Sequence, residues 1–184
     1  MIAQLDAPGE WYLEEAKGDA DGSTLYLIPP PGVELNSSTV IESAVKPRVL
    51  QLRGASPTEF VHDIAIKRIT VAHSAPTFMA DYEMPSGGDW AIYRGGAIFL
   101  DGTEDITIED CTVDHPGGNG IFLSNHVWRT QLLSNTVAHA GDSGILLVGS
   151  TEFMNGTRNT YRKYTRNPPL ACAILQPSPS RGVD

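Results

Sequence analysis

The fold of this chain is decided by the stretch GAIFLDGTEDITIEDCTVDHPGGN (residues 96–119), GIFLSNHVWRTQLLSNTVAHAGDS (120–143) and GILLVGS (144–150). A glycine precedes an apolar run at Gly96, Gly120 and Gly144, so the segments repeat at a constant step of 24 (120 − 96 and 144 − 120). Cys111 and Asn135 keep the same step. A fixed period in this range is typical of stacked repeats. Because the apolar residues alternate in short runs broken by Gly, Asn and Asp, each segment is predicted to be one coil of a parallel β-helix.

One more coil precedes this stretch. The segment DIAIKRITVAH (63–73) matches DITIEDCTVDH (105–115) position for position, at a step of 42 (105 − 63). The larger step reflects an insertion at residues 74–95, which is rich in aromatic residues. Parallel strands stack about 4.8 Å apart, so neighbouring coils should bury their apolar residues against each other. The residues expected to stack inward are Ile106, Ile108 and Val113 in one coil and Leu132, Leu133 and Val137 in the next.

The chain is expected to have three parts. Residues 1–44 form an entry segment in which Trp11–Leu13 and Leu25–Ile28 pair as a β-hairpin. Residues 45–150 form the coils with their insertion, and residues 151–184 are irregular and begin a further strand at 171–175. Because no polar capping coil is visible, we interpret the chain as a fragment of a longer β-helix protein.

Composition limits the class of partner. The chain has 184 residues, a formal net charge of −9 and a pI near 4.9, so a phosphate backbone would be repelled. A neutral polysaccharide or oligosaccharide is compatible with this charge, and nucleic acid is not expected. No apolar run approaches the roughly 20 residues of a membrane span. Two sequons, at Asn36 and Asn155, favour a secreted, extracellular parent protein, although the N-terminus resembles no secretory signal. We expect a monomer without a cofactor.

The coils resemble the right-handed parallel β-helix of the pectin-lyase-like superfamily, through their Gly-Ile-x-Leu starts and their ITIEDCTVDH-type second halves. PGEWYL (8–13) and TLYLIPP (24–30) are similar to the segment that precedes the helix in β-helical glycoside hydrolases of the xylanase, β-xylosidase and α-L-fucosidase types. PSGGDW (85–90), followed later by GDS (141–143), looks like uncharacterised β-helix proteins of that group. The resemblance implies an all-β, right-handed solenoid and a carbohydrate-active ancestry, but it does not assign the catalytic pair.

The candidate catalytic residues are Asp114 and Asp142. Glycoside hydrolysis usually needs two carboxyl groups, about 5–5.5 Å apart for retention and about 6.5–9.5 Å for inversion. Asp142 aligns with Gly118, one coil away and four positions beyond Asp114, so a separation of roughly 10 Å or below is feasible. Asp101 lies two coils from Asp142 at the other end of a strand, which excludes that pair. The alternative is that Asp114 is an ordinary outward polar residue and Asp142 a turn residue.

The candidate substrate-binding residues are His115, His139, Trp90, Tyr93 and Trp128. With His73, the two histidines occupy one position in three coils, where they could bond a sugar hydroxyl or tune Asp114. The alternative is a purely structural histidine ladder. We expect no metal, because the spacing of stacked coils is uncomfortable for three histidines that must all reach one ion.

Two functions remain open for the sequence. The first is a glycoside hydrolase acting on a polysaccharide, and the second is a non-catalytic glycan-binding or structural β-helix module. A polysaccharide lyase is a third class, which would need calcium-binding acids and an unpaired arginine such as Arg53 or Arg94.

Overall fold

The computed structural model describes residues 5–14, 22–86 and 90–149, and in these residues the chain is all-β with no helix. Accordingly, no helix of the described residues is long and apolar enough to cross a membrane. The chain divides into two compact units, Met1–Glu42 and Ser43–Asp184. The predicted strand at 171–175 and the sequon at Asn155 lie outside the described residues.

The first unit contains the expected hairpin. Strand β1 (Trp11–Glu14) pairs antiparallel with β2 (Thr24–Leu27), so that Tyr12 lies opposite Tyr26. The two tyrosine rings stack with their centroids 6.3 Å apart. The hydrogen bond that the Tyr26 hydroxyl donates to the Glu14 carboxylate raises the pKa of Tyr26.

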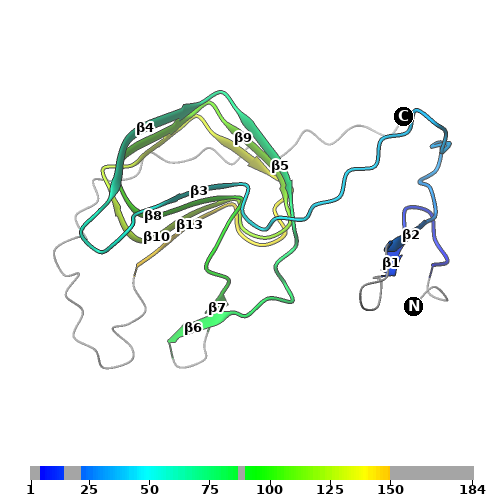
Figure 1. The fold of residues 1–184 in the computed structure, drawn as a ribbon, viewed down its shortest axis with the longest axis horizontal. Helices are drawn as coiled ribbons and strands as arrows, with labels where there is room; N and C mark the ends of the chain where they lie inside the picture. Colours follow the sequence, from blue (N-terminus) through cyan, green and yellow to red (C-terminus); the bar gives the residue numbers. More distant parts are fainter. Residues whose placement is uncertain (1–4, 15–21, 87–89, 150–184) are drawn as a thin grey trace. The chain divides into compact units, whose positions relative to one another are not determined.

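The second unit holds the remaining strands, most of them parallel (Figure 1). In chain order they are β3 (Leu50–Arg53), β4 (Val61–Lys67), β5 (Thr70–Ser74), β6 (Glu83–Ser86), β7 (Trp90–Ile92), β8 (Ile98–Glu109), β9 (Thr112–Pro116), β10 (Ile121–Trp128), β11 (Gln131–Leu133), β12 (Thr136–Ala138) and β13 (Ile145–Val148).

Two parallel sheets carry the repeat. In the larger one, β8 pairs with β3 and β4 along one edge and with β10 and β11 along the other, and β13 pairs with β10. In the smaller one, β9 lies between β5 and β12. The insertion forms a separate antiparallel pair, β6 and β7. Thus successive passes of the chain add strands to both parallel sheets.

The predicted register is confirmed over most of the repeat. Thr136 pairs with Thr112, which is the expected step of 24 (136 − 112). Ile106 pairs with Ile64, which is the expected step of 42 (106 − 64). Strand β3, whose sequence resembles the start of β8, pairs with it so that Arg53 lies beside Asp101.

The register differs from the prediction at the start of β8. Ile121 pairs with Ile98, one position short of the constant step, so Gly96 is not the equivalent of Gly120. The expected step returns only after a β-bulge, in which Asn125 and His126 of β10 lie opposite a single residue of β8. A bulge adds one residue to only one of two paired strands. An alignment of the sequence by a constant step therefore does not detect it.

Left-handed residues mark the corners of successive passes. The residues of three such columns all have φ between 48° and 58°: Asp63, Asp105 and Arg129; Arg68, Asp110 and Ser134; His73, His115 and His139. Non-glycine residues rarely adopt this conformation, so its recurrence at equivalent positions shows that the fold requires it there. Asp63 and Asp105 hold equivalent positions within β4 and β8 in one of these columns.

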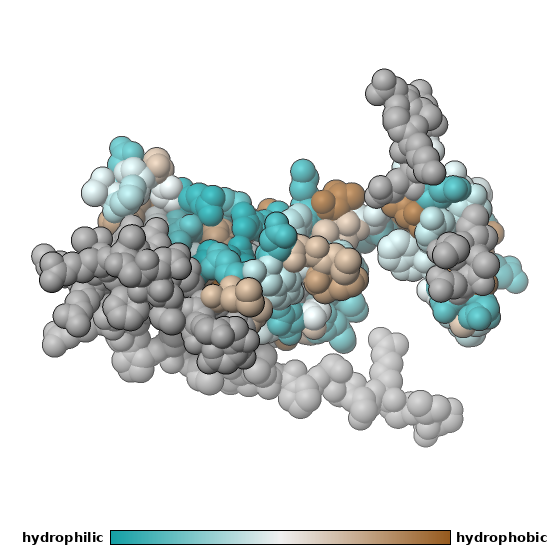
Figure 2. All heavy atoms as spheres, turned by 90° about the horizontal axis from the view of Figure 1, so that it is seen from below, coloured by the Kyte–Doolittle hydropathy of each residue, from teal (hydrophilic) through white to brown (hydrophobic). Residues whose placement is uncertain are grey.

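The core lies between the two parallel sheets. All but one of the side chains predicted to stack inward are buried in this core. The buried ones are Ile106, Ile108, Val113, Leu132 and Val137. The exception is Leu133, which pairs with Glu109 and lies outside this core. A second apolar cluster contains Ile92, Phe99 and Phe122. Figure 2 shows one face of the chain, on which hydrophilic and hydrophobic residues are interspersed.

Candidate functional site

Asp114 is the one carboxylate in its ladder of paired residues. It lies in β9 between Ala72 of β5 and Ala138 of β12. Alanine side chains carry no polar atom, so neither ladder neighbour offers a side-chain partner to the carboxylate. Asp114 therefore differs in residue type from the equivalent positions of the neighbouring passes, Ala72 and Ala138.

The backbone at His115 turns its side chain toward Asp114. Consecutive residues of a regular strand point to opposite faces, but His115 has a left-handed φ of 48°. As a result both Asp114 and His115 are accessible to solvent, while Val113 before them and Pro116 after them are buried. The same conformation at His139, which follows β12, presents a second imidazole to this face.

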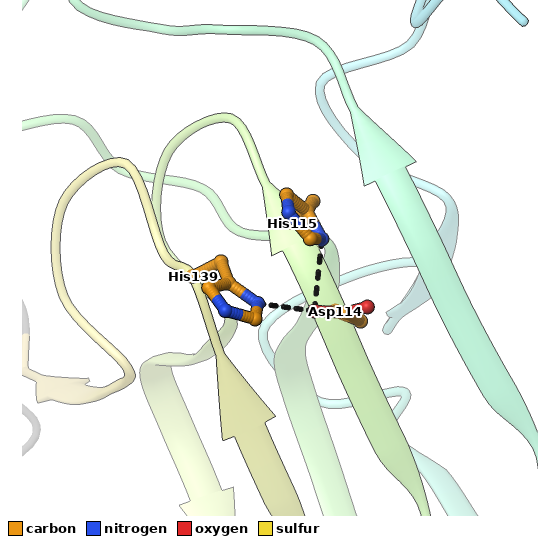
Figure 3. A group of neighbouring side chains, drawn as sticks. All are labelled: Asp114, His115 and His139. Atoms are coloured by element: carbon orange, nitrogen blue, oxygen red, sulfur yellow. Dashed lines mark hydrogen bonds and ion pairs between the residues drawn. The ribbon is translucent and has the colours of Figure 1, made fainter. Parts of the chain in front are cut away.

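The two imidazoles converge on one carboxylate oxygen (Figure 3). The Nδ1 atoms of His139 and His115 lie 2.8 Å and 2.9 Å from Oδ1 of Asp114. The contact from His139 is a hydrogen bond, and because an ionised carboxylate can only accept, Nδ1 of His139 carries the proton. Both contacts are made to Oδ1, so they leave Oδ2 for a further partner.

The histidines also stack on each other. The ring centroids of His115 and His139 are 4.3 Å apart, and those of His73 and His115 are 5.5 Å apart. The side chains of Asp114, His115 and His139 are 37%, 53% and 52% exposed, so a ligand can reach all three. The ladder predicted from the sequence is therefore present, and two of its rings share one carboxylate.

These contacts stabilise the charged form of Asp114. The hydrogen bond from His139 lowers the pKa of the carboxyl below its ordinary value, and the bond from His115 acts in the same direction. Partial loss of solvent opposes both effects. The carboxylate is thus ready to act as an acceptor, base or nucleophile, and not as a general acid near neutral pH.

The insertion begins beside this cluster. A Cβ atom at Gly117, two residues beyond His115, would lie 2.5 Å from the backbone nitrogen of Pro76. At Gly118 it would lie 2.3 Å from the Oγ1 atom of Thr77. The two glycines therefore let the first residues of the insertion pack directly against the turn that follows β9.

Asp142, the other predicted catalytic residue, makes separate contacts. Its backbone N–H donates to the carbonyl of Gly118, and its carboxylate accepts a hydrogen bond from the Ser143 hydroxyl at 3.3 Å. It lies outside the cluster of Asp114, His115 and His139. The structure thus brings Asp114 together with the two histidines predicted to bind substrate.

The aromatic candidates lie elsewhere. Tyr93 contacts Tyr82 of the insertion with a centroid distance of 6.2 Å. Trp128 ends β10 in the larger sheet, and the Arg129 guanidinium lies 5.9 Å from its ring. Trp90 begins β7, and its side chain is not among those described.

Arg94, which the sequence offered only as an arginine for a lyase, has a structural role in the fold. Its Nε atom donates to the Glu83 carboxylate at 2.8 Å, and its Nη1 atom donates to the buried Ser124 hydroxyl at 3.0 Å. It therefore ties the β6–β7 pair to β10. Because Arg94 belongs to the non-repeating insertion, no periodic signal marks it. Arg53, the other arginine considered for a lyase, is paired with Asp101.

Metal-binding atoms meet in the same cluster. One potential ligand atom from each of Asp114, His115 and His139 lies within 4.8 Å of the others. This combination of a carboxylate and two imidazoles differs from the set of three stacked histidines for which the coil spacing predicts no metal. Comparisons with protein-family models, curated proteins and solved structures give no significant match for this chain.

Proposed function

We propose that this chain is a right-handed parallel β-helix module of a carbohydrate-active protein, and that it binds a polysaccharide at Asp114, His115 and His139. The fold part of the proposal is supported by the alternation of strands between two parallel sheets at the constant step of the sequence repeat. Parallel strands of one sheet that are joined by a crossover almost always connect with a right-handed turn. The left-handed corner columns are also in keeping with repeated coils.

The observation that carries the binding function is the carboxylate shared by two half-exposed imidazoles. Sugar hydroxyls both donate and accept hydrogen bonds, so they can pair with the remaining Asp114 oxygen and with the ring nitrogens. The stack of His73, His115 and His139 repeats these groups at centroid distances of 5.5 and 4.3 Å. A polymer with a regular repeat suits such a regular array better than an isolated small molecule.

A neutral glycan fits the charge of the chain. The formal net charge is −9, and the cluster itself contains an ionised carboxylate. An anionic polymer would therefore be repelled at this face unless a cation bridged the two. Xylan is accordingly a better first ligand than pectate.

The binding test compares matched variants on a panel of xylan, fucan and pectin, with affinity electrophoresis and calorimetry as readouts. Asp114→Asn and His139→Asn should each weaken binding of the preferred glycan by about tenfold or more, since a charge-assisted hydrogen bond contributes about 1.5–3 kcal/mol. His62→Asn is the control, because His62 pairs with Asp63 at 2.7 Å in the other parallel sheet. Binding to no glycan, or equal binding by all variants, would contradict the proposal.

Hydrolysis is a second candidate function, and the ionised state of Asp114 favours it. A carboxylate held in its charged form suits the nucleophile or base of a glycosidase, and Asp142 would then supply the acid. Asp142→Asn should abolish release of reducing ends while leaving glycan affinity nearly unchanged. Full hydrolytic activity in both Asp114→Asn and Asp142→Asn would remove this candidate but not the binding function.

A further inference from the structure

We infer that Asp114, His115 and His139 form a surface site for a divalent transition-metal ion of the zinc, nickel or copper kind. The inference is independent of the proposed glycan, because the ion can be tested alone. It also departs from the expectation drawn from the sequence, in which no metal was assigned.

The ligand atoms are spaced as the ligands of one ion would be. Bonds from such an ion to imidazole nitrogen and carboxylate oxygen are about 2.0–2.2 Å long, so neighbouring ligand atoms around one ion lie roughly 3 Å apart. The Nδ1 atoms of His139 and His115 lie 2.8 and 2.9 Å from Oδ1 of Asp114. All three ligand atoms fall within 4.8 Å of one another.

The two imidazole rings approach one oxygen atom of Asp114. Both Nδ1 atoms lie close to the same carboxylate oxygen, and His139 is hydrogen-bonded to it (Figure 3), so the two nitrogens already meet at one point. An ion beside Oδ1 needs the lone pair of each Nδ1, so any ring proton on Nδ1 exchanges through solvent and each neutral imidazole keeps its single proton on Nε2. The rings are half exposed and nearly parallel, at 23°, which leaves room for the small pivots that bring both lone pairs to the ion.

The backbone holds the ligands in place before any ion binds. His115 and His139 share a left-handed corner conformation, and Ala138 next to His139 is paired in register with Asp114. The ligands thus come from two adjacent passes of the chain fixed by parallel hydrogen bonding. Little ordering of the protein is needed on binding, which reduces the free-energy loss of forming the site.

The ligand set selects the class of ion. Calcium and magnesium prefer sites made entirely of oxygen, whereas imidazole nitrogens favour zinc, copper and nickel. Three protein ligands on an exposed face leave coordination positions for water. Such an ion would keep open positions, as catalytic and ligand-binding metal sites do.

The chain provides its own matched control. His73 occupies the same column as His115 and His139, and its ring stacks on His115, but the residue beside it in the Asp114 ladder is Ala72. His73 is therefore not part of the three-ligand group. Asn is well tolerated in the left-handed conformation, so His→Asn changes the ligand at any of these positions without straining the backbone.

The experiment titrates zinc chloride alone into the untagged chain by calorimetry, in a buffer that does not bind metal. We expect one ion per chain, an affinity loss of more than about tenfold in Asp114→Asn and in His139→Asn, and an unchanged affinity in His73→Asn. Thermal melts recorded in EDTA verify that each variant is folded. No zinc binding by the wild-type chain, or equal affinity in all three variants, would overturn the inference.

A second measurement needs no variant, in case one fails to fold. Nickel added to the isotopically labelled wild-type chain should broaden the imidazole NMR signals of His115 and His139 before that of His62, which lies in the other parallel sheet. Broadening of His62 first, or of no histidine, would show that the ion binds elsewhere or not at all. A chain that binds zinc but no glycan retains this inference and loses the proposed function, and the reverse result does the opposite.

Discussion

The side chain of Asn135 forms hydrogen bonds with the backbone of the preceding pass of the chain, at Cys111 and Ile108. Its Oδ1 atom accepts a hydrogen bond from the backbone N–H of Cys111 at 2.9 Å, and its Nδ2 atom donates to the carbonyl of Ile108 at 2.8 Å. Both bonds are buried. The constant step that relates Asn135 to Cys111 in the sequence is therefore a direct contact in space.

Replacing Asn135 should destabilise the chain strongly. Asn135→Ala leaves one backbone donor and one acceptor buried without partners, which should lower the free energy of unfolding by about 2–4 kcal/mol. Urea denaturation followed by circular dichroism measures the change. Asn125→Gly is the control, because Asn125 is exposed and has a left-handed φ of 54° that glycine adopts easily. Equal effects of the two substitutions would contradict this role of Asn135.

Gly141 should not accept a side chain. A Cβ atom at this position would lie 2.5 Å from the backbone carbonyl oxygen of Gly117 in the preceding pass. Gly141→Ala should therefore cost about 1–3 kcal/mol of unfolding free energy, because rigid backbone must move. Gly149→Ala is the matched control, since no atom of the described part of the chain lies within 4 Å of the added group. The prediction fails if thermal melting separates neither variant from the wild type.

The titration of Asp114 should depend on both histidines, and more on His139. In the folded chain we expect the carboxyl to titrate below the ordinary aspartate value of about 3.9. His139→Asn should raise this midpoint more than His115→Asn, because the bond from His139 is the largest cause of the shift. Carbon NMR of the side-chain carboxyl group measures the midpoints directly, and an unshifted Asp114 in the wild type would refute the prediction.

The same shift makes stability fall in acid. A carboxyl whose pKa is lower in the folded than in the unfolded chain contributes stability above its unfolded pKa and loses it as the pH falls through the folded pKa. Asp114→Asn should therefore flatten the loss of stability below about pH 4. Unfolding curves collected from pH 6 to pH 2.5 test this, and an unchanged acid slope in the variant would count against it.

A surface ion pair at another corner should respond to salt. Arg129 donates from Nε and Nη2 to the two Asp105 oxygens, each at 2.5 Å, and this lowers the pKa of Asp105. Both side chains are exposed enough for salt to screen them. Asp105→Asn, which retains the left-handed backbone, should reduce the melting temperature slightly at low salt and hardly at all in 1 M sodium chloride. A difference that persists at high salt would show that the pair acts through packing instead.

The repeated part of the fold could be predicted because each repeat supplies the same pattern. The two constant steps, the N-terminal hairpin and the inward apolar residues follow from periodicity and alternation. The errors fall where a local rule departs from the average. A constant step does not detect the bulge opposite Gly102. Residues alternate between two faces through β11, so Leu132 pairs with Ile108 in the core and Leu133 pairs with Glu109 outside it.

The sequence predicted which residues form the site, but it did not predict how they are arranged. Asp114, His115 and His139 were chosen from the sequence, yet their shared oxygen depends on the left-handed backbone at both histidines. That conformation reverses the strand alternation and cannot be recognised from residue type, since histidine adopts it only occasionally. The contacts of Arg94 have no sequence signal, because they join the insertion to Ser124 in a strand of the repeat.

The left-handed corner columns separate backbone geometry from side-chain chemistry. Arg68, Asp110 and Ser134 have the same conformation as the three histidines, although their side chains differ in charge and size. Another corner column of this chain could therefore accept the side chains of the Asp114 cluster by substitution. Histidine at positions 110 and 134, with a carboxylate at the preceding position of one pass, would transplant the Asp114 cluster to a new edge without redesign of the backbone.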